Sequence, residues 1–341
     1  MRGFRNRWIG WLVLLVAFLG LGTPIVHGAS SQKSYAINVI LPSTQMNSQL
    51  QYWQLKLPPK TEQTLQTQVI NTGKEKITVR VQANNATTST NAVVIYSSTQ
   101  KDIYPRAAVS FASLIQGPRT QSVTLDPKQS KIVTFKLKTP SKDYDGVILG
   151  GIYTVATVSP ADAQIRTEVA YKKSVVLQGK DMNVEPTVKF GQVQPVVQAG
   201  KLALALPATN NKAMYADGVT TDLTVTNRTT GKKVFHSAGV DLKFAPNSQW
   251  QWTFPIKNLP GGDYHLRLVT AGRILKRQVV NQDFSITGAQ TSQMNAYNTS
   301  HQDQMKLVWI VIGILVVVLL VATWVYLYYR SRNRAIKRRT K

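Results

Sequence analysis

The chain has 341 residues, enough for about two domains, and carries 41 Lys and Arg against 16 Asp and Glu, a formal net charge of +25. Because 43% of the residues are hydrophobic and 17% are charged, the composition excludes a wholly disordered protein. The absence of cysteine excludes a disulfide scaffold, a thiolate metal site and a cysteine nucleophile.

Residues 1–29 have the pattern of a secretory signal peptide. Three arginines come first, an apolar run follows from Trp8 to Leu21, and the small residues Gly28 and Ala29 mark the cleavage region. We therefore expect the mature protein to begin near residue 30. An N-terminal membrane anchor is the alternative.

The first half of the body predicts β-strands, because polar and apolar residues alternate one by one. Thr64–Ile70 and Ile77–Gln82 show this pattern on either side of Asn71-Thr72-Gly73-Lys74, which predicts a β-hairpin. Lys131–Lys138 repeats the pattern and ends before Pro140.

A longer and more apolar strand is predicted over Gly146–Val158. Gly150 and Gly151 in its middle indicate either a β-bulge or a close approach of another segment. The following strand, Val169–Leu177, lies between two polar breaks and either closes a first domain or opens a second. We place the domain boundary near residue 160.

The second half repeats the alternation. Thr221–Thr226 leads into a turn at residues 227–231, and Ser248–Phe254 alternates with Trp250 and Trp252 on one face. Short strands with turns at this spacing predict an all-β fold of two tandem immunoglobulin-like β-sandwiches, residues 30–160 and 161–287.

The C-terminal part predicts a membrane anchor. Residues 288–306 are polar and predict a stalk, and Leu307 to Tyr329 contains no charged residue, which predicts a transmembrane helix. The Arg and Lys residues of 330–341 then predict a basic cytoplasmic tail. The sequence therefore predicts a single-pass protein of the cell membrane with an extracellular body at the cell wall.

The body by itself keeps a net charge of about +15, which indicates an anionic neighbourhood. Anionic wall polymers such as teichoic acids suit an exported protein, whereas nucleic acid does not. A solvated surface without a specific partner is the alternative.

Two groups of residues resemble the WxL-interacting protein family of Gram-positive bacteria. Asp143-Tyr144-Asp145-Gly146, continuing to Gly150-Gly151-Ile152, resembles the end of the family's first domain. Phe244-Ala245-Pro246-Asn247-Ser248, with the aromatic strand and Gly262-Asp263-Tyr264 after it, resembles the core of its second domain. Ala92 stands where the family usually has Gly, and Pro42-Ser43-Thr44-Gln45 replaces an expected Pro-x-Asn-Gln element.

This resemblance implies that the first domain binds peptidoglycan and that the second engages host matrix or serum proteins. It also implies that the chain is a membrane-anchored partner of secreted WxL-domain surface proteins. The alternative function is a non-specific electrostatic tether, a structural protein of the anionic cell wall.

The candidate binding residues form two groups: Asp145, Gly146, Gly150 and Gly151 in the first domain, and Asn247, Ser248, Trp250 and Trp252 in the second. The first group could shape a groove for glycan or peptide stems, or form a turn and a strand bulge. The tryptophans could stack on sugars or a partner, or pack in the core, and Asn247-Ser248 could equally form a turn.

Catalysis is not expected. The sequence has no HExxH, GxSxG or Gly-rich phosphate loop, and two acids in one turn, Asp143 and Asp145, are more typical of a loop than of a glycosidase. We expect no enzyme activity, no cofactor and no metal site.

Overall fold

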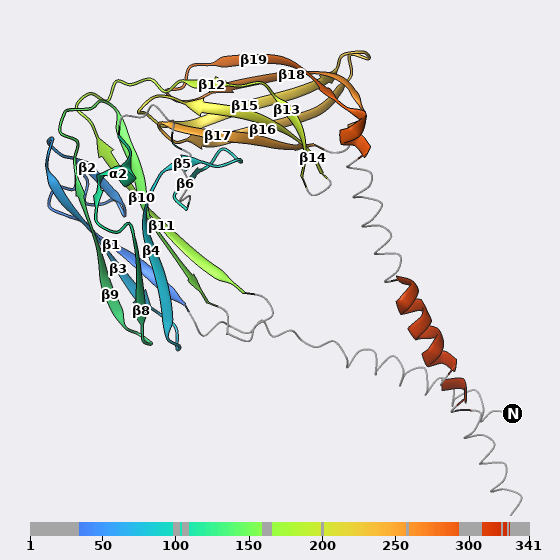
Figure 1. The fold of residues 1–341 in the computed structure, drawn as a ribbon, viewed down its shortest axis with the longest axis horizontal. Helices are drawn as coiled ribbons and strands as arrows, with labels where there is room; N and C mark the ends of the chain where they lie inside the picture. Colours follow the sequence, from blue (N-terminus) through green and yellow to red (C-terminus); the bar gives the residue numbers. More distant parts are fainter. Residues whose placement is uncertain are drawn as a thin grey trace, which may run out of the picture.

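The structure is a computed structural model that describes residues 34–97, 103, 109–158, 166–198, 201–256, 259–292, 309–321, 323–325 and 327. Two β-sandwiches form the body (Figure 1). The predicted all-β class of the body is confirmed. The predicted signal peptide, the end of the stalk and the basic tail lie outside the described residues.

The first sandwich has two sheets. One has the strand order β1-β3-β9-β7, formed by Tyr35–Ile40, Glu62–Asn71, Ser130–Lys138 and Ile115–Gln116. The other has the order β2-β11-β10-β4-β8, formed by Trp53–Lys56, Glu168–Gln178, Val147–Thr157, Ile77–Asn85 and Thr120–Leu125. The apolar residues of each alternating strand point between the sheets, where Leu65, Val79 and Phe135 are buried.

The hairpin predicted around Asn71 is wrong. Strand β3 pairs with β1 and β9, whereas β4 pairs with β8 and β10 in the opposite sheet. The connection at residues 72–76 therefore crosses from one sheet to the other. Alternation reports which face of a strand is buried, and both arrangements bury the same face, so the pattern cannot distinguish them.

Strand β11 belongs to the second of these two sheets of the first sandwich. It pairs with β10 along its whole length, from Val147 opposite Gln178 to Thr157 opposite Glu168, and runs parallel to β2. The strand predicted over Val169–Leu177 therefore closes the first sandwich.

The second sandwich is also built from two sheets. One contains β12 (Val188–Phe190), β13 (Gln194–Gln198), β14 (Lys201–Asn210) and β17 (Ser248–Ile256). The other has the order β16-β15-β18-β19, formed by Lys233–Phe244, Ala216–Asn227, Gly262–Ala271 and Gln278–Ile286. Leu204, Trp252 and Tyr264 lie in the core between them.

The two sandwiches share one pattern of pairing. Strand β3 pairs with β1 and β9 as β14 pairs with β12, β13 and β17, and β4 pairs with β8 and β10 as β15 pairs with β16 and β18. They differ in strand β2, whose parallel pairing with β11 has no counterpart in the second sandwich, and in the connection after β4. Residues 228–232 join β15 to β16, but an insertion of residues 86–119 joins β4 to β8.

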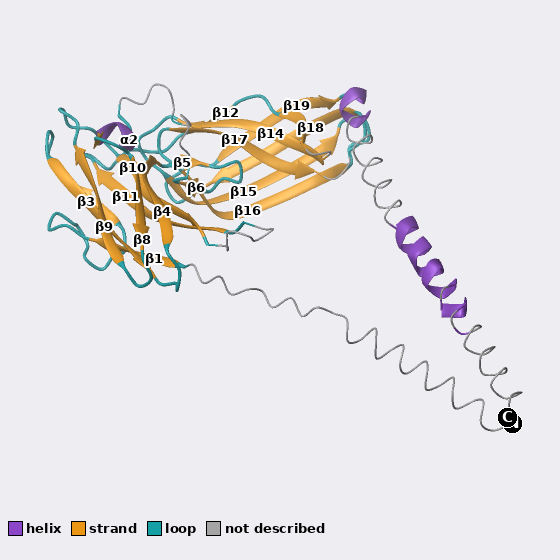
Figure 2. Cartoon of the chain, turned by 60° about the horizontal axis from the view of Figure 1, so that its bottom comes forward, coloured by secondary structure: helices purple, strands orange, loops and turns teal. Residues whose placement is uncertain are grey.

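The insertion contains β5 (Thr87–Thr88), β6 (Val94–Ile95), the short helix α2 (Phe111–Leu114) and β7. In Figures 1 and 2 its β5–β6 part lies beside β16 and β17 of the second sandwich, and β5 contacts both strands. The insertion therefore bridges the two sandwiches.

The predicted placement of the chain across a membrane needs a correction. Within the part of the chain that the structure describes, no helix has both the length and the apolar character needed to cross a membrane. The single-pass localisation predicted from Leu307–Tyr329 is therefore not borne out by the described residues.

Candidate functional site

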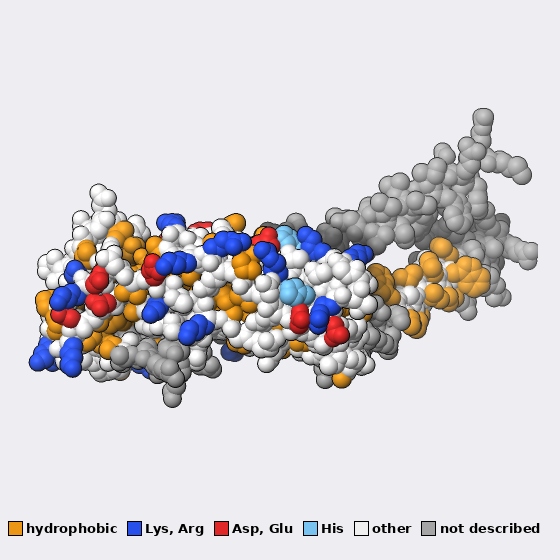
Figure 3. Space-filling model, turned by 90° about the horizontal axis from the view of Figure 1, so that it is seen from above, with side chains coloured by type: hydrophobic (Ala, Val, Ile, Leu, Met, Phe, Trp, Pro, Cys, Tyr) orange, Lys and Arg blue, Asp and Glu red, His pale blue; other side chains and the backbone are white. Residues whose placement is uncertain are grey.

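Charge alone does not mark a site on this protein. Lys and Arg side chains are spread over both sandwiches on the face shown in Figure 3, with acidic side chains between them. A site needs a concave surface as well, because only a cavity surrounds a ligand group on several sides.

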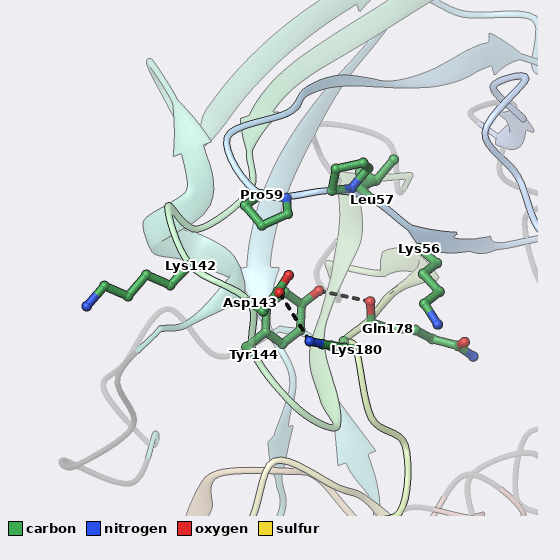
Figure 4. Close-up of a pocket in the computed structure, with 10 residues that line it drawn as sticks. Lys56, Leu57, Pro59, Lys142, Asp143, Tyr144, Gln178 and Lys180 are labelled. Carbon is green, nitrogen blue, oxygen red and sulfur yellow. Dashed lines mark hydrogen bonds and ion pairs between the residues drawn. The ribbon is translucent and has the colours of Figure 1, made fainter.

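A pocket of about 240 Å³ lies at one end of the first sandwich. Three segments line it: Lys56–Pro59 at the end of β2, Lys142–Tyr144 in the connection from β9 to β10, and Gln178–Lys180 at the end of β11 (Figure 4). A volume of this size holds one small chemical group rather than a drug-sized molecule.

The wall formed by Pro58 and Pro59 is held by Thr139, which follows β9. The Thr139 hydroxyl donates to the Pro58 carbonyl oxygen at 2.7 Å and accepts from the Thr61 N–H at 2.8 Å. The Lys60 N–H donates to the Pro140 carbonyl oxygen at 2.9 Å. Two prolines and these hydrogen bonds give this wall a defined position.

Tyr144 forms the floor together with the end of β11. Its hydroxyl donates to the Gln178 carbonyl oxygen at 3.3 Å, and its own carbonyl oxygen accepts from the Lys180 N–H at 2.7 Å. A Cβ atom added at Gly179 would lie 2.2 Å from the Tyr144 carbonyl oxygen, so this position requires glycine. Burial raises the pKa of Tyr144 to about 12.

The pocket is positively charged. Lys56, Lys142 and Lys180 carry three positive charges against the one negative charge of Asp143. Lys180 Nζ lies 3.9 Å from Asp143 Oδ2, but both side chains are well exposed, so this ion pair is weak. In Figure 4 Lys180 points toward Asp143, whereas Lys142 extends outward at the rim.

This arrangement suits an anionic group such as a carboxylate or a phosphate, which ammonium groups and backbone donors can hold. It shows no constellation for covalent or acid–base catalysis. Among the described residues, no group of three or more His, Asp and Glu side chains is placed to hold a metal ion.

The predicted residues Asp145 and Gly146 lie next to this pocket without lining it. Gly146 has a φ of +76°, and its N–H donates to the Asp181 carbonyl oxygen at 2.7 Å. The Asp145 carboxylate accepts from the Asp181 N–H at 3.2 Å. These two residues form a turn that joins the Tyr144 segment to the chain that follows β11.

Gly150 and Gly151 are buried in the middle of β10. An added Cβ atom would lie 2.0 Å from Phe111 Cδ1 at Gly150 and 2.6 Å from Tyr96 Cδ1 at Gly151. Because β10 and β11 keep an uninterrupted register there, the glycines mark a close approach of two aromatic rings and not a bulge. Both rings belong to the insertion.

The second predicted group lies far along the chain from the pocket and is largely buried. Asn247 adopts a φ of +45° in the turn before β17, and Ser248 is fully buried. Trp250 and Trp252 are 8% and 3% exposed and pack in the core against Phe244. The structure therefore brings neither tryptophan into the pocket.

Sequence reasoning missed the pocket residues Lys56, Tyr144, Gln178 and Lys180 as a group. Each lies where a strand or a loop ends, and the three segments are distant in the chain. The sequence holds one local signal for the pocket. Turn-forming or polar residues follow a strand, as in Pro58-Pro59 and Gly179-Lys180.

Two family models match this chain. The WxL Interacting Protein peptidoglycan binding domain matches residues 35–156, and the WxL Interacting Protein host binding domain matches residues 161–296. No curated protein sequence matches the chain.

Several chaperones of known structure are similar to it at a low level. The YadV chaperone is 10% identical with a TM-score of 0.28, covering 73% of this chain and 99% of that chain. The Escherichia coli chaperone DraB is 16% identical with a TM-score of 0.27, covering 75% and 96%. Similarity at this level carries no information about the fold of this chain. The two family models together span most of the chain, in the order of the two sandwiches, and the protein belongs to the WxL-interacting protein family.

Proposed function

We propose that this protein is a cell-surface binding protein that attaches to peptidoglycan through the pocket of its first sandwich. The observation that carries the proposal is the placement of Lys56 and Lys180 around one small concavity. Lys56 lies within the segment matched by the peptidoglycan-binding model, whereas Lys180 lies within the segment matched by the host-binding model, directly after the strand β11 that closes the first sandwich. Peptide stems of peptidoglycan bear free carboxylates, and one such group fits the charge and the size of the pocket.

The second sandwich supplies the protein-binding part of this function. The match to a host-binding domain covers this whole sandwich together with β11 of the first, which supports host matrix or serum proteins as its partners. WxL-domain surface proteins are the partners that the family name implies. The tryptophans of β17 are too buried to form the contact surface, so the exposed strands of this sandwich are the place to look.

The competing function is an electrostatic tether without a specific site. The spread of basic side chains over both sandwiches favours it, because such a surface attracts any wall polyanion (Figure 3). The two functions differ in salt dependence: attraction between exposed charges fades within a Debye length of about 8 Å at physiological ionic strength.

The test is co-sedimentation of the full chain, purified in mild detergent, with peptidoglycan stripped of teichoic acid. The double variant Lys56→Gln/Lys180→Gln removes two pocket charges. The matched control Lys136→Gln/Lys172→Gln removes two exposed charges that do not line the pocket.

We expect binding at both low and high salt, with affinity lowered about tenfold by the pocket variant and little changed by the control. An equal loss in the two variants, or binding that needs teichoic acid and disappears in salt, would sink the pocket assignment and favour the tether.

A further inference from the structure

The insertion places a residue of the first sandwich in the core of the second. Ala92, at the tip of the β5–β6 hairpin, is 0% exposed and belongs to the core cluster that contains Phe244 and Trp252. Its φ of +58° is unusual for a residue with a Cβ atom, so the surrounding structure must hold it in place.

The tip lies in the seam between two edge strands. Strand β16 ends one sheet of the second sandwich, and β17 ends the other. The Lys243 N–H of β16 donates to the Ala92 carbonyl oxygen at 3.2 Å, and the Thr253 N–H of β17 donates to the Thr90 carbonyl oxygen at 3.0 Å. The hairpin thus pairs with backbone groups that edge strands otherwise leave unpaired.

A buried hydroxyl network joins the base of the tip to the second sandwich. Thr88 Oγ1 and Ser248 Oγ are 2.8 Å apart, and Thr88 Oγ1 accepts from the Ala245 N–H at 2.9 Å. Ser248 Oγ donates to the Ala245 carbonyl oxygen at 3.0 Å, which leaves Thr88 as the donor between the two hydroxyls. Buried polar groups that are all paired favour one geometry over others.

The other end of the insertion is fastened to the first sandwich. Tyr96 packs over Gly151, its hydroxyl lies 2.8 Å from Ser174 Oγ, and its carbonyl oxygen accepts from the Asn84 side chain at 2.8 Å. Phe111 packs against Gly150 on the same strand. Two aromatic rings that pack over adjacent glycines of β10 therefore hold the insertion against the first sandwich.

The second sandwich pairs β15 with β16 and β18 as the first pairs β4 with β8 and β10, and it closes its corresponding connection with residues 228–232 alone. A sandwich of this kind therefore does not need residues 86–119 to join its strands. Part of the added length packs on the first sandwich through Phe111 and β7, and the β5–β6 hairpin makes contacts with the second sandwich.

We propose that the seam between β16 and β17 is an interaction surface for an extended segment with small and hydroxyl side chains, and that the insertion of the same chain fills it. The insertion is then an intramolecular clamp that completes the second sandwich and fixes it to the first. The wall-binding and protein-binding sandwiches act as one unit.

The chain contains no cysteine, so two introduced cysteines can form an intramolecular disulfide only with each other. In the full chain, Thr88→Cys/Ser248→Cys places two sulfurs where the hydroxyl oxygens are 2.8 Å apart, close enough for a disulfide. Diamide, which takes up two electrons and two protons, oxidises the pair. The control Thr88→Cys/Ser237→Cys puts the second thiol on the middle of β16.

We expect nearly complete formation of an intramolecular disulfide in the first variant, seen as a monomer without free thiols, and free thiols in the control. Free thiols in both variants would overturn the clamp. A covalent dimer would overturn it as well, because it would show that the seam is filled by a second copy.

A second measurement tests whether the tip completes the second sandwich. Ala92→Asp puts a charge into the core, and Asn91→Asp puts the same charge on the neighbouring exposed residue. By hydrogen exchange, we expect amides of β16 and β17 to exchange at least tenfold faster in the first variant and at unchanged rates in the second, with β3 and β9 unaffected. Unchanged exchange of β16 and β17 in Ala92→Asp would contradict the proposal.

Discussion

Asn71 and Asn210 make matching hydrogen bonds at corresponding places in the two sandwiches, and Asn71 makes one more, to the Asp126 carbonyl oxygen at 3.0 Å. Each is the last residue of its strand, β3 or β14, and each is fully buried. Asn71 Nδ2 donates to the carbonyl oxygens of Glu75 at 2.8 Å and Leu125 at 3.1 Å, and its Oδ1 accepts from the Gly73 N–H at 2.9 Å.

Asn210 repeats these contacts. Its Nδ2 donates to the carbonyl oxygens of Met214 at 2.8 Å and Ala245 at 2.9 Å, and its Oδ1 accepts from the Lys212 N–H at 3.2 Å. In both sandwiches, one amide side chain thus forms hydrogen bonds with two backbone segments. One is the connection that crosses between the sheets, and the other is the end of a later strand. Backbone groups buried at such a crossing need a partner of this kind.

Replacing either amide by a carboxyl group should destabilise its own sandwich. Asn71→Asp and Asn210→Asp keep the shape but remove the donor to two or more carbonyl oxygens, which we expect to cost about 2–3 kcal/mol each in the free energy of unfolding. Urea denaturation measures this cost. Asn38→Asp, on the exposed face of β1, is the control and should change stability by less than about 0.5 kcal/mol. Equal effects at all three positions would contradict this role.

Gly150→Ala should destabilise the first sandwich because the new Cβ atom would collide with Phe111. We expect a loss of about 2–4 kcal/mol, and a much smaller additional loss when Phe111→Ala is already present. A double-mutant cycle in urea measures this coupling. Gly288→Ala, where no atom lies within 4 Å, is the control. Additive losses would show that the glycine is needed for another reason.

Trp252→Ala should act on stability rather than directly on binding. The side chain packs against Phe244 and Phe254 in the core, so its removal should cost about 3–5 kcal/mol. Thermal unfolding measures the loss, and binding to purified host matrix protein is measured below the new transition. A folded variant of normal stability that no longer binds would show that Trp252 contacts a ligand.

Stability should fall at alkaline pH partly because of Tyr35. Its hydroxyl donates to the Val169 carbonyl oxygen at 3.0 Å, and burial raises its pKa from 10.0 to about 12. A phenol whose pKa is higher in the folded chain stabilises folding below the unfolded pKa, and this contribution is lost as the pH rises through the folded value. The decline therefore falls between about pH 10 and pH 12.

Tyr35→Phe removes this titrating group. Urea denaturation gives the free energy of unfolding of both chains at each pH. The difference at pH 7 reports the lost hydrogen bond and is subtracted first. We then expect the variant to lose less stability than the original chain over that pH range. Identical declines would rule out Tyr35 as a source, and Tyr144→Phe, whose phenol also has a pKa of about 12, is the next variant to measure.

The strands themselves were largely predictable. Lys131–Lys138 and Ser248–Phe254 correspond to β9 and β17 with nearly the same bounds. Alternation is a local consequence of the strand's two-residue repeat, so it survives in a sequence read alone. The resemblance to WxL-interacting proteins is confirmed by the two family models, which match residues 35–156 and 161–296.

The candidate site was much less predictable. Lys56, Tyr144 and Lys180 come together because β2 runs parallel to β11 and the β9–β10 connection folds over both ends. The clamp is similar: Thr88 and Ser248 lie 160 residues apart, and no spacing in the sequence relates them. Long-range neighbours follow from the pairing of strands, which the alternation pattern leaves open.

By itself, the sequence determined the β-class, the positions of several long strands and the family, because strand periodicity and short motifs are local properties of the chain. Only the tertiary structure decided that β3 and β4 lie in opposite sheets, that Gly150 and Gly151 receive two aromatic rings, and that Ala92 lies in the core of the other sandwich. These features depend on which buried face meets which other face, and that choice is made by packing and hydrogen bonding between segments far apart in the chain.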